Sequence, residues 1–282
     1  MSERDAAPAA AAGGDQRNLL MRVVAALVLA PLAIGAAYAG GWCWIALVTL
    51  GAIGLFMEWL AVTYTVRNVP VTIAGIVALV LAAPFFAIGN VNAALVVLAL
   101  GLIAVGFRTT RPRLWAIAGF LYAAAAQIAS VLVRLDHAKG LSALILVLFV
   151  VWATDIGGYF AGRAIGGPKL WPRVSPKKTW AGALGGFAAS LAVAAGFAAC
   201  GLGKAVPLLL VSAVLSVVSQ LGDLFESAVK RRFGVKDSSH LIPGHGGLMD
   251  RLDGFVAAIL MAWIIGFLRH GVHSAGSGLM VW

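Results

Sequence analysis

Several carboxylates occur where an apolar chain does not ordinarily carry charge, at or near the ends of long hydrophobic runs. They are Asp155, Asp223, Glu226, Asp250 and Asp253. A carboxylate within a bilayer costs about 2.5–3.5 kcal/mol on insertion scales, so its presence indicates a partner or a function. Two acids from one helix end and two from the next could hold a divalent cation. Oxygen ligands without clustered Cys or His favour Mg²⁺ or Mn²⁺. For any single acid, an interhelical ion pair remains the alternative.

Polar side chains recur every three or four residues along the run that carries Asp223. They are Ser212, Ser216, Ser219, Asp223, Ser227 and Lys230. This spacing places them on one helical face, which we expect to look into the bundle or a water-filled cleft rather than at lipid. Packing of helices through hydroxyl groups can explain Ser212 and Ser216. It does not explain the two acids beside Lys230.

A glycine-rich loop, 228–250, lies between the two helices that carry most of the acids. Gly244, Gly246 and Gly247 allow backbone N–H groups to approach an anion closely. His245 could donate to a phosphate, carry a proton or only stabilise the loop. Cations surround it: Lys230, Arg231, Arg232, Lys236 and Arg251. A metal, a phosphate-binding backbone and basic side chains together indicate phosphoryl or nucleotidyl transfer.

A second basic loop, 162–179, precedes another apolar run. Its end reads Ser175, Pro176, Lys177, Lys178, Thr179. Because Pro176 interrupts the chain, the two lysines and the Thr179 hydroxyl should lie at a helix N-terminus, where an anion can bind. A Lys-Lys pair on its own is more often a topology signal or a contact to anionic head groups.

The elements that must position these residues are membrane helices. Of 282 residues, 61% are apolar and 11% charged, which excludes a soluble domain, a disordered chain and a disulfide scaffold. Cys43 and Cys200 form no metal or redox motif, although both fall at expected outer helix ends. Runs of about 20 apolar residues predict an all-α polytopic integral membrane bundle of about nine transmembrane helices. They are 19–38, 42–62, 70–89, 91–107, 114–133, 141–161, 180–200, 205–227 and 251–269.

Charge sets the expected orientation. With the N-terminus cytoplasmic, 17 of the 21 lysines and arginines fall on the inner side, as the positive-inside rule requires. The net charge of +10 is therefore read as topology, and no nucleic-acid partner is expected. We expect a disordered cytoplasmic tail (1–18), one membrane catalytic domain (19–270) and a short C-terminal tail (271–282). The polar site then faces the cytoplasm at the inner leaflet of a bacterial inner (plasma) membrane.

The chain resembles the phosphatidate cytidylyltransferase (CDP-diacylglycerol synthase) family. The family motif Ser-x-apolar-Lys-Arg, Lys-Asp, His-Gly-Gly, Asp-Arg-apolar-Asp is filled throughout 227–253. A second stretch, Asp-x-x-x-Tyr-x-x-Gly-Arg followed by Ser-Pro-Lys-Lys-Thr-Trp, is matched from Asp155 to Trp180. One position departs: where the family often has Glu after the Trp, this chain has Ala181, so no metal ligand is placed on that loop.

The resemblance implies transfer of CMP from CTP to phosphatidic acid, with Mg²⁺ required (Mn²⁺ or a second cation as alternatives) and a homodimer as the assembly. It places metal on Asp223 and Asp250, with Asp253 and Asp155 as further candidates. The catalytic residues it implies are Asp223, Asp250, Lys230, Ser227, His245 and Arg251. The expected substrate and phosphate contacts are Ser175, Lys177, Lys178, Thr179, Arg231, Lys236, Gly246 and Gly247.

Two other classes of protein place acids in membranes. A secondary transporter or channel would carry them near the bilayer midplane on broken helices, whereas here they lie at one end. Another lipid-phosphate enzyme, such as a CTP-dependent polyprenol kinase or a sugar-phosphate transferase to polyprenyl phosphate, would share the metal, the phosphate and the membrane. The completeness of the motif across 227–253 argues against it.

Overall fold

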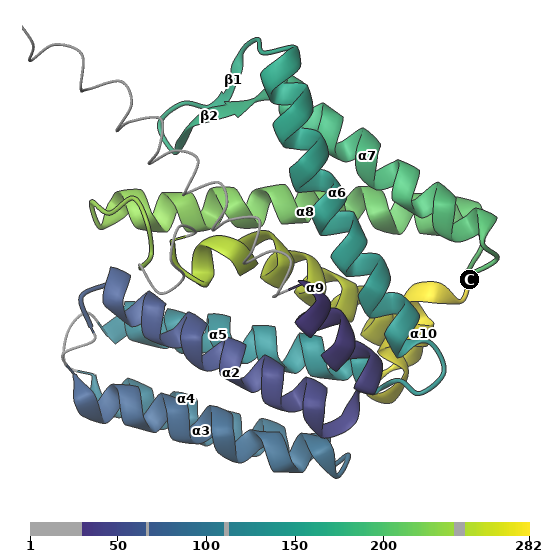
Figure 1. Ribbon diagram of the computed structural model, residues 1–282. Coiled ribbons are helices and arrows are strands. Elements are labelled where there is room, and N and C mark those ends of the chain that lie inside the picture. The colour runs from purple at the N-terminus through teal and green to yellow at the C-terminus, as the bar shows by residue number, and fades with distance from the viewer. Residues whose placement is uncertain (1–29, 66–67, 110–112, 240–245) are drawn as a thin grey trace, which may run out of the picture.

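The computed structural model describes residues 30–65, 68–109, 113–239 and 246–282, and in these ranges the chain is a helix bundle with one small sheet (Figure 1). A helix, Ala30–Ala39, precedes α2. The long helices are α2 (Gly41–Val62), α3 (Val69–Ala87), α4 (Val91–Arg108), α5 (Arg113–Leu135), α6 (Gly140–Ala164), α7 (Trp180–Ala199), α8 (Ala205–Arg232) and α9 (Met249–His270). The remaining elements are β1 (Lys169–Trp171), β2 (Ser175–Thr179), η1 (Val272–Ser274) and α10 (Ala275–Met280).

Eight of the described helices, α2 to α9, are long and apolar enough to cross a membrane. They confirm the predicted polytopic bundle, and each matches a predicted span within a few residues. The first predicted span, 19–38, is described only from residue 30 onward, where it is helical. Between its two ends, a helix satisfies its backbone hydrogen bonds internally, which a segment in lipid must do.

Side-chain caps begin three of these helices close to the predicted boundaries. The Asn68 side chain accepts from Val71 N at 3.4 Å before α3, and that of Asn90 accepts from Ala93 N at 3.1 Å before α4. The hydroxyl of Thr179 accepts from Gly182 N at 3.1 Å and begins α7. Each cap satisfies an N–H group that the first helical turn leaves unpaired.

Two hydrophobic cores share α9. In the first, α2, α3 and α5 pack around fully buried aromatic residues, and the rings of Phe56 and Phe120 meet edge to face at 5.7 Å. In the second, α6 and α8 pack against α9 through residues such as Leu144, Leu215 and Ile259. Figure 1 shows α9 near the centre of the bundle, with α6 running from the β1–β2 hairpin into the bundle. The helix that carries Asp250 and Asp253 is therefore held from both sides.

Three features go beyond the predicted spans. Within the 162–179 loop, β1 and β2 form an antiparallel hairpin that pairs Lys169 with Thr179 and Trp171 with Ser175. Helix α8 continues past residue 227 to Arg232. The C-terminal residues form η1 and α10, and Leu279 and Met280 are buried in the second core.

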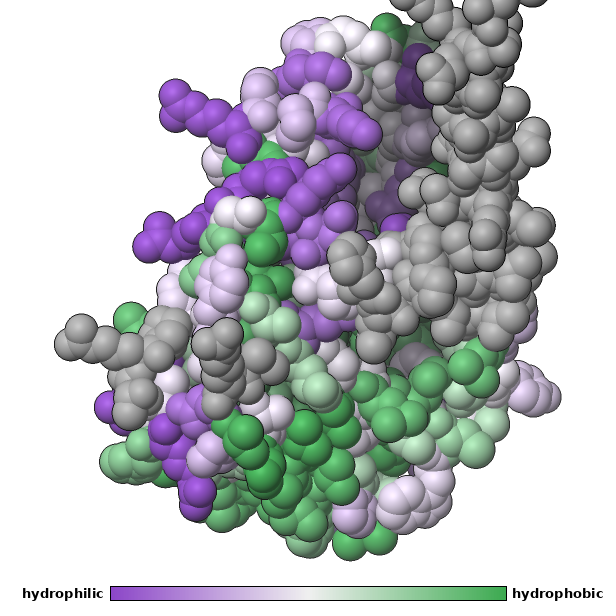
Figure 2. Space-filling view, turned by 60° about the vertical axis from the view of Figure 1, so that its left-hand side comes forward, coloured by the Kyte–Doolittle hydropathy of each residue, from purple (hydrophilic) through white to green (hydrophobic). Residues whose placement is uncertain are grey.

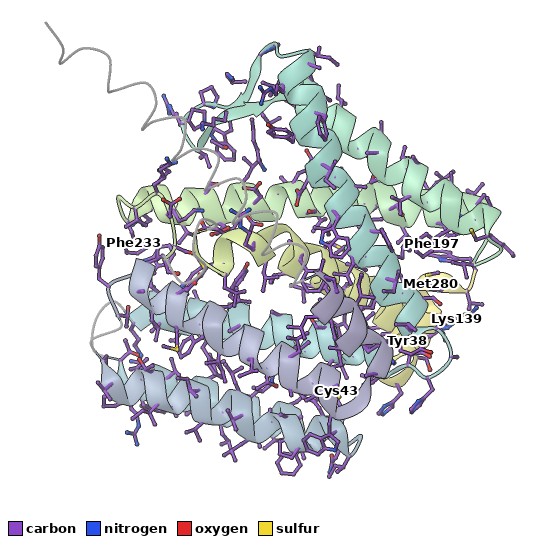
Figure 3. The ribbon with its side chains drawn as sticks, in the orientation of Figure 1. Tyr38, Cys43, Lys139, Phe197, Phe233 and Met280 are labelled. Atoms are coloured by element: carbon purple, nitrogen blue, oxygen red, sulfur yellow. The ribbon has the colours of Figure 1, made fainter. Side chains whose placement is uncertain are left out.

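At the end of the bundle opposite the α8–α9 loop, a buried aspartate joins two segments by hydrogen bonds. Tyr38, Cys43, Lys139 and Met280 lie at this end, and Phe233 lies at the other (Figure 3). Buried Asp136 accepts hydrogen bonds from Ala138 N at 2.8 Å, Lys139 N at 3.1 Å and Ser277 N. These bonds tie α10 to the α5–α6 turn. Cys43 and Cys200 are both exposed and unbonded.

Asp136→Asn is expected to destabilise the fold by about 1–3 kcal/mol, because charged acceptors make the stronger hydrogen bonds. Burial alone would raise the pKa of Asp136, but the N–H donors of Ser277, Lys139 and Ala138 outweigh it and hold the pKa below its usual value. A lowered folded-state pKa stabilises the protein above the unfolded value, about 3.9, and this stabilisation is lost as the pH falls through the folded value. The melting temperatures of wild type and variant should therefore differ at pH 7 and converge below about pH 4. A constant difference across this range would contradict the assignment.

Candidate active site

One cavity of about 1260 Å³ is lined by residues from the helix Ala30–Ala39 and from α2, α5, α6, β1, β2, α7, α8 and α9. One part of its wall is charged and includes Asp155, Lys177, Lys178, Asp223, Lys230, Asp250, Arg251 and Asp253. Another part is apolar and includes Trp44, Leu47, Leu55, Leu148 and Trp152. On the outer surface, Figure 2 shows hydrophilic residues gathered over one region and hydrophobic residues over another. The cavity can hold a molecule that is charged at one end and apolar at the other.

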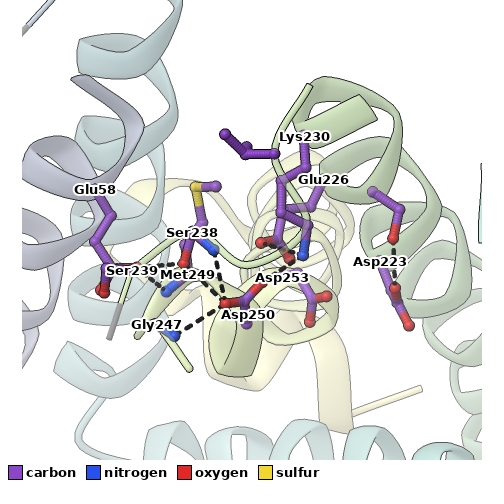
Figure 4. Close-up of polar contacts among 12 residues, drawn as sticks. Glu58, Asp223, Glu226, Lys230, Ser238, Ser239, Gly247, Met249, Asp250 and Asp253 are labelled. Atoms are coloured by element: carbon purple, nitrogen blue, oxygen red, sulfur yellow. Dashed lines mark hydrogen bonds and ion pairs between the residues drawn. The ribbon is translucent and has the colours of Figure 1, made fainter. Parts of the chain in front are cut away.

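Asp223 joins the hairpin to α8. Its carboxylate forms an ion pair with Lys178 of β2, and both side chains are about 30% exposed. The Ser227 hydroxyl, one turn further along α8, is 3.4 Å from Asp223 Oδ1 (Figure 4). The basic loop 162–179 thus reaches the carboxylate of Asp223, on the polar face of α8 singled out from the sequence. Because the pair is partly exposed to the cavity, a bound anion could reach Lys178.

Asp250, in the first turn of α9, is surrounded by donors (Figure 4). Its Oδ1 pairs with Lys230 of α8. Its Oδ2 accepts from Ser238 N at 3.0 Å, Gly247 N at 2.9 Å and the Ser238 hydroxyl at 3.0 Å. These contacts fix the carboxylate between α8 and the ends of the α8–α9 loop (233–248, described except for 240–245).

Lys230 lies between acids of two helices. Besides Asp250 it contacts Glu226 Oε1 at 3.2 Å, one turn earlier on α8. Glu226 is 1% exposed, and besides Lys230 its carboxyl group interacts with that of Asp253 on α9. Asp253 Oδ1 accepts from Gly254 N at 2.7 Å, at the start of α9. Lys230 is therefore the cation that joins the acidic faces of α8 and α9.

Two glycines permit the close approach of the loop to these carboxylates. Gly246 has φ +83°, a conformation that side chains disfavour. A Cβ on Gly247 would lie 1.8 Å from Ser238 Oγ and 2.5 Å from Glu58 Oε2, so no side chain fits there. Gly246 and Gly247 thus allow the loop to come close enough to donate hydrogen bonds to Asp250 and Glu58. This role is separate from the binding of any anion by the loop.

The structure brings most, though not all, of the singled-out residues to the cavity. Those that line it are Asp155, Lys177, Lys178, Thr179, Asp223, Lys230, Asp250, Arg251 and Asp253. Those that do not line it are Ser175, Ser227, Arg231, Lys236, Gly246 and Gly247. Arg231 and Lys236 are exposed, and Arg231 donates to Val235 O at 3.4 Å. His245 lies outside the described residues.

Two residues near the site were not singled out from the sequence. Glu58 is 5% exposed in α2 and accepts hydrogen bonds from the α8–α9 loop, and Ser238 lies between Glu58 and Asp250. Glu58 could have been singled out from the sequence because it is an acid inside the apolar run 42–62. Its partner could not be read from the sequence, because it lies about 180 residues away.

The polar residues on one face of α8, from Ser212 to Lys230, fall into a group that packs between helices and a group that lines the cavity. The Thr154 hydroxyl of α6 donates to Ser216 Oγ at 2.8 Å, so Ser216 joins two helices. Ser212 is fully buried, and its hydroxyl has no hydrogen-bond partner among the described residues. Asp223 and Lys230, further along the same face, line the cavity instead.

The donor set fits a hard divalent cation in its chemistry. Asp155, Asp223, Asp250 and Asp253 offer carboxylate oxygens to one cavity. Among the described residues, no three acids, histidines or cysteines gather closely enough to enclose an ion by themselves. Mg²⁺ sites in nucleotide-handling enzymes commonly use one or two carboxylates, with waters and substrate phosphates completing the shell. Lys178 and Lys230 supply the positive charge next to Asp223 and Asp250 in this structure.

Comparison with known proteins agrees with this chemistry. The model of the cytidylyltransferase family matches residues 20–268. The chain is 37% identical over 260 residues to a phosphatidate cytidylyltransferase of Brucella suis biovar 1, covering 88% of this chain and 93% of that protein. It is 38% identical over 261 residues to the enzyme of that name in Brucella melitensis biotype 1, with the same coverage of each chain. A phosphatidate cytidylyltransferase of Bacillus subtilis is 46% identical over 122 residues, 42% of this chain and 44% of that one.

Proposed function

The chain belongs to the cytidylyltransferase family, and we propose that it transfers the cytidylyl group of CTP to the phosphate of phosphatidic acid. The products are CDP-diacylglycerol and pyrophosphate. The observation that carries this proposal is a cavity whose wall is charged at one part and apolar at another. A phosphorylated lipid has an apolar part and a charged part, and a nucleoside triphosphate is charged. Together they match both parts of the wall.

In the proposed reaction, a phosphate oxygen of phosphatidic acid attacks the α-phosphorus of CTP. A new P–O bond forms, the bond from the α-phosphorus to the oxygen that bridges to the β-phosphorus breaks, and pyrophosphate leaves with the electron pair. The attacking oxygen is already anionic, so no general base is needed. The main obstacle is repulsion between two anions, which positioned positive charge lowers.

The described side chains supply that charge from two directions. Lys177 and Lys178 reach the cavity from β2, and Lys230 and Arg251 reach it from α8 and α9. Because Asp223 and Asp250 already hold two of these lysines, the amino groups are fixed before substrate binds. Fixed cations need little reorganisation when charge develops on the phosphates.

A divalent cation is part of the proposal. Asp223 and Asp250 would hold Mg²⁺, or Mn²⁺, with Asp253 and Asp155 as further candidates and room for a second ion. When bound, the ion would neutralise phosphate charge and polarise the bond to the leaving pyrophosphate.

The proposal also includes the orientation of the protein in the membrane and its oligomeric state. The excess of basic residues at the cavity end supports a cytoplasmic face, because basic loops stay on that side. Phosphatidic acid would then enter from the inner leaflet of the bacterial inner membrane, and CTP from the cytoplasm. We also propose that the protein forms a homodimer, as its resemblance to the family implies.

The experiment that tests this function incubates membranes containing the protein with cytidine-labelled CTP and phosphatidic acid. We expect the label in a lipid that retains cytidine. Parallel reactions with a polyprenol or a polyprenyl phosphate distinguish the other lipid-phosphate enzymes. Labelled lipid only with a polyprenyl acceptor, or no labelled lipid with any acceptor, would overturn the proposal.

Removal of divalent cations should abolish the reaction. We expect cytidylyl transfer by purified protein to fall to background in excess EDTA and to return on addition of Mg²⁺, with Mn²⁺ as a weaker or equal substitute. The reason is that one or two carboxylates and substrate phosphates together form the site. A full rate in EDTA would contradict the metal assignment while leaving the transfer reaction itself intact.

A further inference from the structure

The start of α9 is held from a helix nearly two hundred residues earlier in the chain. Glu58 of α2 accepts from Leu248 N at 2.8 Å and from Met249 N at 2.7 Å. It also accepts from the hydroxyls of Ser238 at 2.8 Å and Ser239 at 2.6 Å. Figure 4 shows Glu58 on the opposite side of these donors from Asp250. Each Glu58 oxygen therefore meets one backbone N–H and one hydroxyl.

These bonds replace a cap that α9 does not supply itself. The first N–H groups of a helix have no partner within the helix. The N-cap residue, Leu248, has an apolar side chain and makes no side-chain cap. A carboxylate placed there satisfies these N–H groups and interacts favourably with the positive end of the helix dipole.

The same contacts lead to Asp250. The Ser238 hydroxyl lies 2.8 Å from Glu58 Oε2 and 3.0 Å from Asp250 Oδ2, so its one hydrogen faces both carboxylates. Met249, whose N–H Glu58 accepts, is the residue before Asp250. Glu58 itself is buried and does not line the cavity. Its influence on chemistry must therefore be indirect, and Asp250 is the charged cavity residue that these contacts reach.

We propose that Glu58 is a positioning residue: it caps α9 from α2 and so fixes the Asp250 carboxylate toward Lys230 and the cavity. For activity this inference rests on the proposed function. For structure it does not, because the capping bonds exist whatever the cavity binds. Outer groups that orient the residues of a metal or phosphate site commonly affect activity by about 10- to 100-fold.

The variant that tests it is Glu58→Gln, which keeps the size of the side chain. An amide nitrogen cannot accept, so one of the two N–H groups of α9 loses its partner. We expect hydrogen exchange at the amides of 248 and 249 to speed up by at least about 10-fold. We expect kcat to fall about 10- to 100-fold while the KM for phosphatidic acid is unchanged.

Asp136→Asn is the matched control, because it also neutralises a buried carboxylate that accepts backbone N–H groups, but at the other end of the bundle. It should change neither exchange at 248 and 249 nor kcat. Ser238→Ala is a milder second variant in case Glu58→Gln does not fold, and it should lower kcat in the same direction without raising KM.

Hydrogen exchange at 248 and 249 tests the capping role of Glu58, and kcat tests the link from Glu58 to Asp250. Unchanged exchange at 248 and 249 in Glu58→Gln would overturn the capping role. Faster exchange with a wild-type kcat would overturn the link to Asp250. If the wild-type protein forms no cytidylyl lipid, the proposed function fails, whereas the exchange result still tests the cap.

Discussion

Asp223→Asn and Asp250→Asn are each expected to lower cytidylyl transfer by about 100- to 1,000-fold. Both carboxylates line the cavity, and each holds a lysine from a different element, Lys178 of β2 and Lys230 of α8. An amide of the same size keeps one oxygen, but it lacks the negative charge that orients the lysine and attracts a divalent cation. The loss should fall on kcat, because these groups act on the phosphates rather than on the acyl chains.

The measurement is initial rate against the concentration of each substrate for purified protein, with size-exclusion chromatography to establish that each variant is folded. Asp136→Asn serves as the control for neutralising an aspartate away from the cavity. Asp223→Asn and Asp250→Asn enzymes that both turn over at near the wild-type rate would remove these residues from the site.

Lys230→Met should cost both stability and activity. Removal of one partner of a buried ion pair costs about 3–5 kcal/mol, because the remaining charge is left without compensation. Here the remaining partners are Glu226, which is 1% exposed, and Asp250. Activity should fall by about 100-fold or more, because a fixed cation beside the phosphates is also lost.

The double variant Lys230→Met with Glu226→Gln separates the two effects. Neutralising Glu226 removes one of the two carboxylates that Lys230 contacts, so part of the lost thermal stability should return. Activity should not return, because no cation faces the cavity at this position. Recovery of both would mean that Lys230 serves only to balance Glu226.

The bundle could be predicted because hydropathy reports directly on the bilayer. Runs such as 42–62 and 70–89 match α2 and α3 closely, since every backbone group in lipid must be bonded within a helix. The extension of α8 to Arg232 was not predicted, because a helix that leaves the bilayer is no longer marked by apolar residues. The β1–β2 hairpin was missed for a similar reason, since Lys169–Thr179 is short, polar and without clear alternation.

The residues of the site could be predicted better than their partners. Acids at helix ends are conspicuous in an apolar chain, and the structure brings Asp155, Asp223, Asp250 and Asp253 to one cavity. The pairing of Lys178 with Asp223 depends on how the hairpin folds back over α8, which spacing along the chain does not encode. Glu58 shows the same limit, because its role depends on the packing of α2 beside the start of α9.

The most direct test of the account follows the separate phosphates of CTP in purified protein. One reaction contains CTP labelled at the α-phosphate and a second contains CTP labelled at the γ-phosphate, each with phosphatidic acid. We predict that the α-label enters the lipid and that an equal amount of γ-label appears in pyrophosphate. Transfer of the γ-label to lipid, or retention of both labels in CTP, would contradict the proposal that this cavity joins a lipid phosphate to the cytidylyl group.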